Sequence, residues 1–127
     1  MPKFYIFYSS SFSLLASIYS SIKMIPKLKN ERKKLIKNSF YLREALKKEN
    51  FNIGNSQTNI IPIIIGDPKK TISISKELER KGLYVVPIRP PSVPPNSSRL
   101  RISISSCHSH SNIKKLFNSL KCLKNKM

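Results

Sequence analysis

The sequence predicts an α/β fold in which one small β-sheet packs against helices. Residues 14–25 and 27–49 repeat apolar side chains every three or four positions, which is the spacing of an amphipathic helix. Residues 100–105 alternate apolar and polar side chains, which is typical of a strand with one covered face. The apolar run 60–65 is too short for a helix, and it predicts a strand covered on both faces. The expected order is helix, helix, strand, helix, strand, strand, helix.

The first expected helix carries an apolar stripe that ends at Pro26. The stripe consists of Leu14, Leu15, Ile18, Ile22 and Ile25. Residues 4–22 carry no charge, so a signal peptide or membrane anchor is one interpretation, but seven serines dilute the run. Because hydroxyl groups fit poorly in a continuous apolar span, we expect no membrane association. The stripe is expected to pack on a part of the protein outside this sequence or on a second subunit.

Local signals set the expected bounds of the later elements. Leu28, Leu35, Leu42, Ala45 and Leu46 form the inner face of the second helix. Asp67 is a candidate N-cap and Gly82 a candidate C-cap for a helix over 69–81, ahead of a strand over 83–88. Pro62 is expected near an edge or a start of its strand. Ser109 is expected to cap a last helix, with Ile113, Leu116, Phe117 and Leu120 facing inward.

The chain is expected to divide into three parts. Residues 1–26 end at the break at Pro26, residues 27–122 form an α/β domain, and residues 123–127 form a basic, frayed tail.

One arginine stands in a setting that suits anion recognition. Four prolines between residues 90 and 95 predict a rigid, extended connection, and Asn96 tolerates left-handed backbone geometry. In the strand that follows, Leu100 and Ile102 share one face while Arg101 and Ser103 share the other. A guanidinium held in the middle of a strand can bind a carboxylate or phosphate through two parallel hydrogen bonds. The alternative is an ordinary strand arginine that pairs with a surface glutamate.

The net charge of +18 is extreme for 127 residues. Nucleic acid is the usual partner of such a chain, but the lysines are spread through the sequence, and charge alone supports only non-specific attraction, so codon bias is the favoured explanation. We therefore expect no specific nucleic-acid partner. Cys107 and Cys122 have no metal-ligand spacing and predict reduced thiols in the cytoplasm. His108 and His110 are interpreted as structural residues between a strand and a helix.

The sequence around Arg101 resembles a known enzyme signature. The stretch Arg-Pro-Pro-Ser-Val-Pro-Pro at 89–95, followed by Arg-Leu-Arg-Ile-Ser at 99–103, is similar to the C-terminal signature of the 8-amino-7-oxononanoate synthases. These enzymes belong to the α-oxoamine synthases, which depend on pyridoxal 5'-phosphate (PLP), and they act in biotin synthesis. The string Ile-Pro-Ile-Ile-Ile-Gly-Asp at 61–67 also matches, and the likeness extends from about residue 4 to about residue 120.

The resemblance implies a fold and a set of site residues. The fold is the C-terminal small domain of a fold-type I PLP-dependent transferase. The resemblance also implies that residues 1–26 are a strand end and first helix from the junction with a missing large domain. Arg101 takes the position that binds the carboxylate of the amino-acid substrate, and Arg89 lines the same cleft. Ser9 takes a position near the cofactor phosphate of the partner subunit, although a serine that satisfies backbone donors at the start of a helix is an equal alternative. Phe12-Ser13 departs from the Pro-Pro that is common there.

The resemblance also implies partners. The reaction joins a pimeloyl thioester to L-alanine and needs a lysine that holds PLP, yet no lysine here stands in a matching context. We therefore expect the chain to be inactive alone and not to hold PLP without a missing N-terminal catalytic domain or a second subunit. The alternatives are a small basic binding protein without enzymatic activity and a degraded gene remnant.

Overall fold

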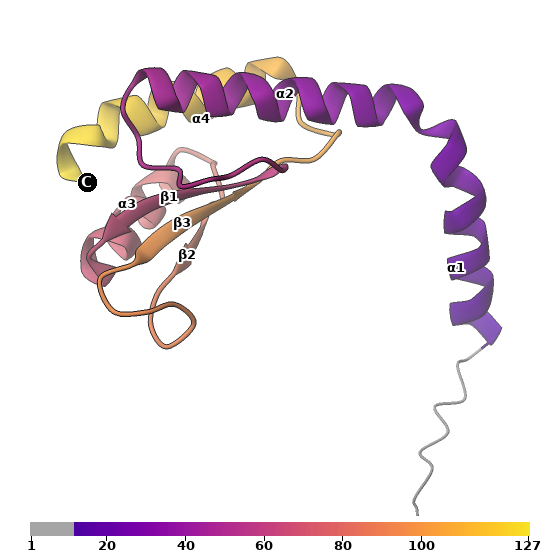
Figure 1. Ribbon diagram of the computed structural model, residues 1–127, viewed down its shortest axis with the longest axis horizontal. Helices are drawn as coiled ribbons and strands as arrows, with labels where there is room; N and C mark the ends of the chain where they lie inside the picture. The colour runs from indigo at the N-terminus through magenta and orange to yellow at the C-terminus, as the bar shows by residue number, and fades with distance from the viewer. Residues whose placement is uncertain (1–11) are drawn as a thin grey trace, which may run out of the picture. The chain divides into compact units, whose positions relative to one another are not determined.

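A computed structural model of the protein describes residues 12–127 (Figure 1). The chain divides into two compact units, residues 1–31 and residues 32–127. Ser9, the expected cofactor-phosphate residue, lies outside the described residues.

The first unit contains an exposed helix. Helix α1 spans Phe12–Met24, and a 3₁₀ turn over Ile25–Lys27 follows it, so the chain breaks at Pro26 as the sequence predicts. The side chains of the predicted stripe are about half exposed, from 47% for Ile18 to 59% for Ile22. No residue of α1 is buried in the part of the chain that the structure describes. The stripe is therefore an apolar surface that the described residues leave uncovered.

The second unit is built on a small antiparallel sheet. Its strands are β1 (Ile60–Gly66), β2 (Val86–Ile88) and β3 (Ser98–Ser103), and the order β1-β3-β2 places β3 in the centre. Strand β3 pairs antiparallel with both neighbours. Pro62 therefore lies in an edge strand, as expected for a residue without a backbone N–H.

Helices cover one face of this sheet. Helices α2 (Lys29–Lys48), α3 (Pro68–Arg80) and α4 (His110–Leu123) contribute buried leucines and isoleucines to one core. Ile61 pairs with Ile102 and Ile63 with Leu100, so these four side chains share a sheet face. All four are buried in the same core as the helices. The unit is a two-layer α/β sandwich, and the described residues cover one face of its sheet.

The prediction that β1 is covered on both faces is wrong for the described residues. Ile61 and Ile63 are 0% and 1% exposed, whereas Ile60 is 39% exposed and Ile64 is partly exposed. One helical layer therefore buries only alternate side chains of the continuous apolar run in β1. No segment among residues 12–127 fully buries the second face of β1.

The local caps form as predicted. The Asp67 carboxylate accepts hydrogen bonds from the backbone N–H groups of Lys69 and Lys70, at 2.6 and 3.1 Å, and α3 begins at Pro68. Gly82 has a φ of +74° at the end of α3, where a side chain would be strained. The Ser109 hydroxyl accepts from the Asn112 N–H at 3.1 Å at the start of α4.

Strand β2 is shorter than the predicted strand over 83–88. Helix α3 holds residues 83–85, because the Leu83 N–H donates to the Leu78 carbonyl at 3.0 Å and the Ser75 hydroxyl donates to the Val85 carbonyl at 2.7 Å. These residues therefore diverge from β3, and strand pairing begins at Val86.

The proline-rich connection is not extended along its length. The Ser92 N–H donates to the Arg89 carbonyl at 3.1 Å, and the Ser97 N–H donates to the Pro94 carbonyl at 3.3 Å, so two turns follow one another. Asn96 has a φ of +59°, which is the left-handed geometry that the sequence predicts there.

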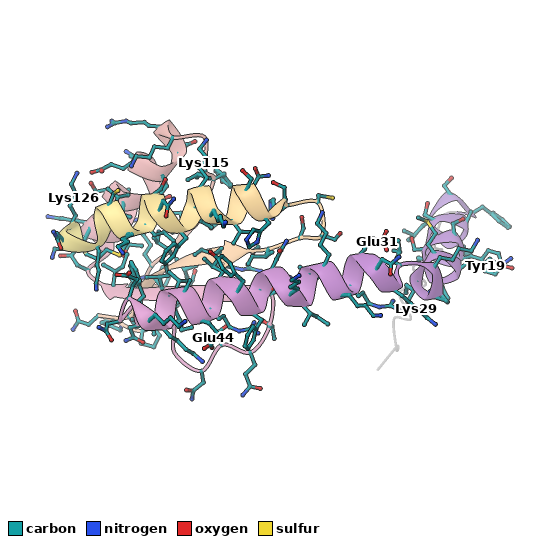
Figure 2. All side chains as sticks on the ribbon, turned by 90° about the horizontal axis from the view of Figure 1, so that it is seen from above. Tyr19, Lys29, Glu31, Glu44, Lys115 and Lys126 are labelled. Atoms are coloured by element: carbon teal, nitrogen blue, oxygen red, sulfur yellow. The ribbon has the colours of Figure 1, made fainter. Side chains whose placement is uncertain are left out.

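The prediction of a frayed C-terminus is also wrong. Helix α4 continues to Leu123, which is 4% exposed, and a 3₁₀ turn covers Lys124–Lys126. The Lys126 amine lies 2.8 Å from a Glu77 carboxylate oxygen; Lys126 is labelled in Figure 2. Met127 packs on the core. The apolar contacts of Leu123 and Met127 and one ion pair to α3 therefore hold this segment.

An ion pair joins the end of α2 to α4. The Lys121 amine donates to a Glu49 carboxylate oxygen at 2.5 Å. This hydrogen bond is the main cause that lowers the pKa of Glu49. Desolvation, the next largest effect, raises it, and the charges of Lys121 and Lys124 lower it further. A carboxyl group with a lowered folded pKa stabilises the fold above its unfolded pKa. That contribution is lost as the pH falls through the folded pKa.

We predict that Lys121→Gln raises the pKa of Glu49 towards its ordinary value, because the main cause of the shift is removed. The carboxyl carbon of Glu49, followed by NMR between about pH 2 and about pH 7, measures this directly. The loss of stability of the wild-type chain on acidification should also exceed that of the variant in urea unfolding. Lys114→Gln, on the same helix, is the matched control. An equal Glu49 pKa in all three proteins would contradict the assignment.

We predict that the 127-residue chain self-associates at micromolar concentration through the stripe on α1, because exposed apolar surface favours association. Leu15→Lys combined with Ile18→Lys should shift the sedimentation profile towards the monomer. Ser17→Lys combined with Ser20→Lys adds the same two charges to the same helix outside the stripe and is the control for charge alone. A sharp monomeric boundary for the wild-type chain would show that the stripe is not adhesive.

Candidate carboxylate-binding site

The candidate site is the face of the sheet opposite the helices. Residues that lie directly opposite one another on paired strands share a face. Arg101 lies opposite Pro62 of β1 and Val86 of β2, and Arg99 lies opposite Ile64 and Ile88. We call this surface the open face. It is formed by Ile60, Pro62, Ile64, Val86, Ile88, Arg99, Arg101 and Ser103.

Arg101 is the unpaired cation of this surface. It is exposed, and among residues 12–127 its side chain has no hydrogen-bond or ion-pair partner. No glutamate of the described chain pairs with it, so the interpretation as an ordinary ion-paired strand arginine finds no support. Its guanidinium retains all five N–H donors for a ligand. The predicted position in the middle of a strand, on the polar side of the alternation, is confirmed.

Arg99 differs from Arg101 although it shares the open face. Its side chain is half-buried, and its Nε–H donates to the Ser97 carbonyl at 3.0 Å. Part of its donor set is therefore used within the loop before β3. The two arginines are a natural pair for comparison, because they share a strand, a face and a charge.

The positions of the other predicted site residues relative to Arg101 stay predictions, and Ser9 lies outside the described residues. Arg89 is exposed and lies one residue beyond β2. Its place beside Arg101 remains a prediction, and the same holds for Ser9. Sequence reasoning missed the apolar neighbours Pro62 and Val86, because strand pairing brings them to Arg101 from distant parts of the chain.

The open face does not fit a complete PLP site. A lysine is needed to hold PLP covalently and an acid to pair with its ring nitrogen. The described residues of the open face include neither a lysine nor an acidic side chain. An unpaired guanidinium between apolar neighbours fits a carboxylate instead.

The described residues offer few other sites for chemistry. The His108 Nδ1 accepts from the Ser105 N–H at 3.1 Å, and its carbonyl accepts from the Asn38 side chain at 3.1 Å. The His110 ring lies 4.6 Å from the Tyr41 ring. Both contacts support the structural interpretation of the histidines. Within residues 12–127, no cluster of three or more His, Cys, Asp or Glu residues could hold a metal ion, and no helix has the length and apolarity to cross a membrane.

Comparison with known proteins defines the class. Residues 1–120 match the family model described as aminotransferase class I and II. The chain belongs to this family, which depends on PLP.

Within this family, the chain is similar to curated proteins named putative 8-amino-7-oxononanoate synthases. The chain is 38% identical over 102 residues to a putative 8-amino-7-oxononanoate synthase of Bacillus cereus (strain AH820), covering 80% of this chain and 26% of that protein. It is 35% identical over 104 residues to one of Paramagnetospirillum magneticum, covering 82% of this chain and 26% of that protein. The predicted resemblance is thereby confirmed. The chain spans about a quarter of the length of these relatives.

Solved structures confirm the predicted fold class. Serine palmitoyltransferase of Sphingomonas wittichii superposes with a TM-score of 0.84 at 26% identity, over 94% of this chain and 31% of that one. The S. paucimobilis enzyme, solved with a bound PLP–myriocin aldimine, gives a TM-score of 0.82 at 25% identity, over 90% of this chain and 29% of that one. An 8-amino-7-oxononanoate synthase of Francisella tularensis shares the fold at a TM-score of 0.69 and 16% identity, over 84% of this chain and 31% of that one.

Proposed function

We propose that the chain supplies the substrate-carboxylate-binding part of an acyltransferase similar to 8-amino-7-oxononanoate synthase, which joins a pimeloyl thioester to L-alanine. The observation that carries the proposal is the unpaired guanidinium of Arg101 at the centre of the open face. The signature from Arg89 to Ser103 and the curated relatives support it.

The position of Arg101 suits this role physically. Its backbone lies in the central strand, which pairs with β1 and β2 on its two sides, so the base of the side chain has little freedom. Pro62 and Val86 offer apolar surface on either side of it. A planar guanidinium can make two parallel, charge-assisted hydrogen bonds to one carboxylate. The flanking surface suits a small apolar side chain such as that of alanine.

The proposed reaction needs a second part of the protein. PLP supplies an electron sink for the substrate when it is bound through a lysine. The residues of this chain would hold and orient the carboxylate, Arg89 would line the same cleft, and Ser9 would lie near the cofactor phosphate. The lysine would come from a catalytic domain or from a second subunit, so the chain would be inactive alone.

The proposed division of the chain follows from this arrangement. Residues 1–26 would join the catalytic domain, residues 27–122 would form the carboxylate-binding domain, and residues 123–127 would close its end. Both cysteines are free and exposed, which supports a reducing compartment, and we place the protein in the cytoplasm.

We predict that a chimera tests Arg101 directly. Residues 12–127 replace the matching C-terminal part of the Bacillus cereus relative, so that the relative supplies its own catalytic domain. In an active chimera, Arg101→Lys replaces a planar two-pronged donor with a point charge. The free energy of alanine binding should become about 2–4 kcal/mol less favourable. This loss is measured as a raised KM for L-alanine with a smaller change in kcat.

Arg99→Lys is the matched control, because Arg99 shares the strand, the face and the charge but uses its Nε–H within the chain. We expect it to change the KM little. Equal effects of the two substitutions, or none at Arg101, would place the carboxylate site on another residue. A chimera that binds PLP and folds but lacks activity would count against the proposed function itself.

A further inference from the structure

A second concave surface lies at the edge of the sheet, away from the sites that the resemblance assigns. We call it the edge cleft. It has a volume of about 380 Å³ and is lined by residues 82–85, by the end of β3 with Ser103, by His108 and by the first half of α4 with Asn112 and Lys115. This volume lies within the usual range of small-molecule sites.

The edge cleft exists because strand pairing between β2 and β3 stops early. The last pair is Val86 with Arg101, and the preceding residues 83–85 are held by α3. The Ile104 N–H donates to the Asn59 carbonyl on the β1 side, at 3.0 Å. Because backbone groups alternate along a strand, the N–H and carbonyl of Ser103 face the other side, towards the cleft. Within residues 12–127, no backbone hydrogen bond to Ser103 crosses this gap.

The polar lining of the edge cleft favours an anion. The backbone N–H of Ser103 is one donor. The Nδ1 of His108 already accepts a hydrogen bond from Ser105, so its Nε2 carries the proton and is a second donor. Lys115 adds a positive charge, and Figure 2 labels it on α4. Its amine lies 4.0 Å from the position that a Cβ on Gly82 would take, which places the charge over the end of α3. Among residues 12–127, no acidic side chain lines the cleft.

The remaining lining is mostly apolar, although Tyr84 and Asn112 also line the cleft with a hydroxyl and an amide group. The apolar part is contributed by Leu83, Val85, Ile102, Ile113 and Leu116. A ligand that fits both parts carries one negative charge at one end and an aliphatic body at the other. A charged body would meet no acidic or second basic partner there, and a wholly apolar ligand would leave the Ser103 N–H unpaired.

We propose that the edge cleft binds a small amphiphilic carboxylate, with its carboxylate against Lys115, His108 and the Ser103 N–H and its aliphatic chain along Leu83, Ile113 and Leu116. The proposal does not rest on the proposed function, because it uses neither Arg101 nor Arg89. The one residue it shares with the open face is Ser103, and there it uses the backbone N–H at the edge of β3 and not the side chain on that face. It can therefore fail or hold independently of the carboxylate-binding role of Arg101.

Equilibrium dialysis of the 127-residue chain against labelled octanoate, below the concentration at which octanoate forms micelles, tests the proposal. We expect saturable binding with one site per chain. Lys115→Gln should weaken binding about tenfold, because a charge-assisted hydrogen bond is lost. Asn112→Trp fills the cleft from the first turn of α4 and should abolish binding. 1-Octanol, which lacks the charge, should bind about tenfold more weakly than octanoate.

Lys114→Gln is the control for net charge, because Lys114 neighbours Lys115 but does not line the cleft. It should alter binding less than about twofold. Equal weakening by both lysine substitutions would show general attraction to a basic chain and overturn the proposal. Octanoate binding that survives Asn112→Trp in a folded variant, verified by circular dichroism, would place the ligand elsewhere. Equal binding of octanol and octanoate would leave no role for the anion donors.

Discussion

The structure depends on the double pairing of β3. This strand lies between β1 and β2, and its alternate side chains Leu100 and Ile102 are 0% and 4% exposed in the core. A shift of one residue in its register would bring Arg99 and Arg101 into that core and expose the two apolar side chains. The burial of an unpaired guanidinium is far more costly than the burial of a leucine is favourable, so the register is strongly specified. The same constraint that forms the core therefore presents Arg101 on the open face.

The elements with local causes could be predicted from the sequence. Asp67, Gly82, Ser109 and Asn96 act through their own side chains or backbone within a few residues, and each performs the predicted role. The alternation around Arg101 is equally local, which is why its place in the strand could be predicted. The predicted α/β class rested on such patterns, and the solved relatives confirm it.

The features that were predicted wrongly depend on distant contacts. The C-terminal segment is ordered by Glu77 of α3 and by the core, neither of which a lysine-rich tail reveals. Strand β2 is short because Ser75 of α3 binds the Val85 carbonyl. The edge cleft results from this same contact, so it too could not be predicted. The distance between the side chains of Arg101 and Arg89 depends on the conformation of the two-turn loop between them. The sequence pattern does not specify that conformation.

Two surfaces of the chain carry apolar side chains that the described residues leave exposed. One is the stripe on α1, and the other is the open face, where Ile60 and Val86 are 39% and 37% exposed. Apolar side chains in such numbers favour burial. Because the chain spans about a quarter of its curated relatives, both surfaces support the proposal that a further part of the protein completes the enzyme.

The most direct test of the central claim observes the two arginines of β3 in one experiment. The Nε–H signals of ¹⁵N-labelled protein are followed by NMR while acetate replaces chloride at constant ionic strength. The Arg101 signal should shift in a saturable manner, because its guanidinium is unpaired, whereas the Arg99 signal should shift little, because its Nε–H donates to Ser97. Equal shifts of both signals, or a shift at Arg99 alone, would contradict the account.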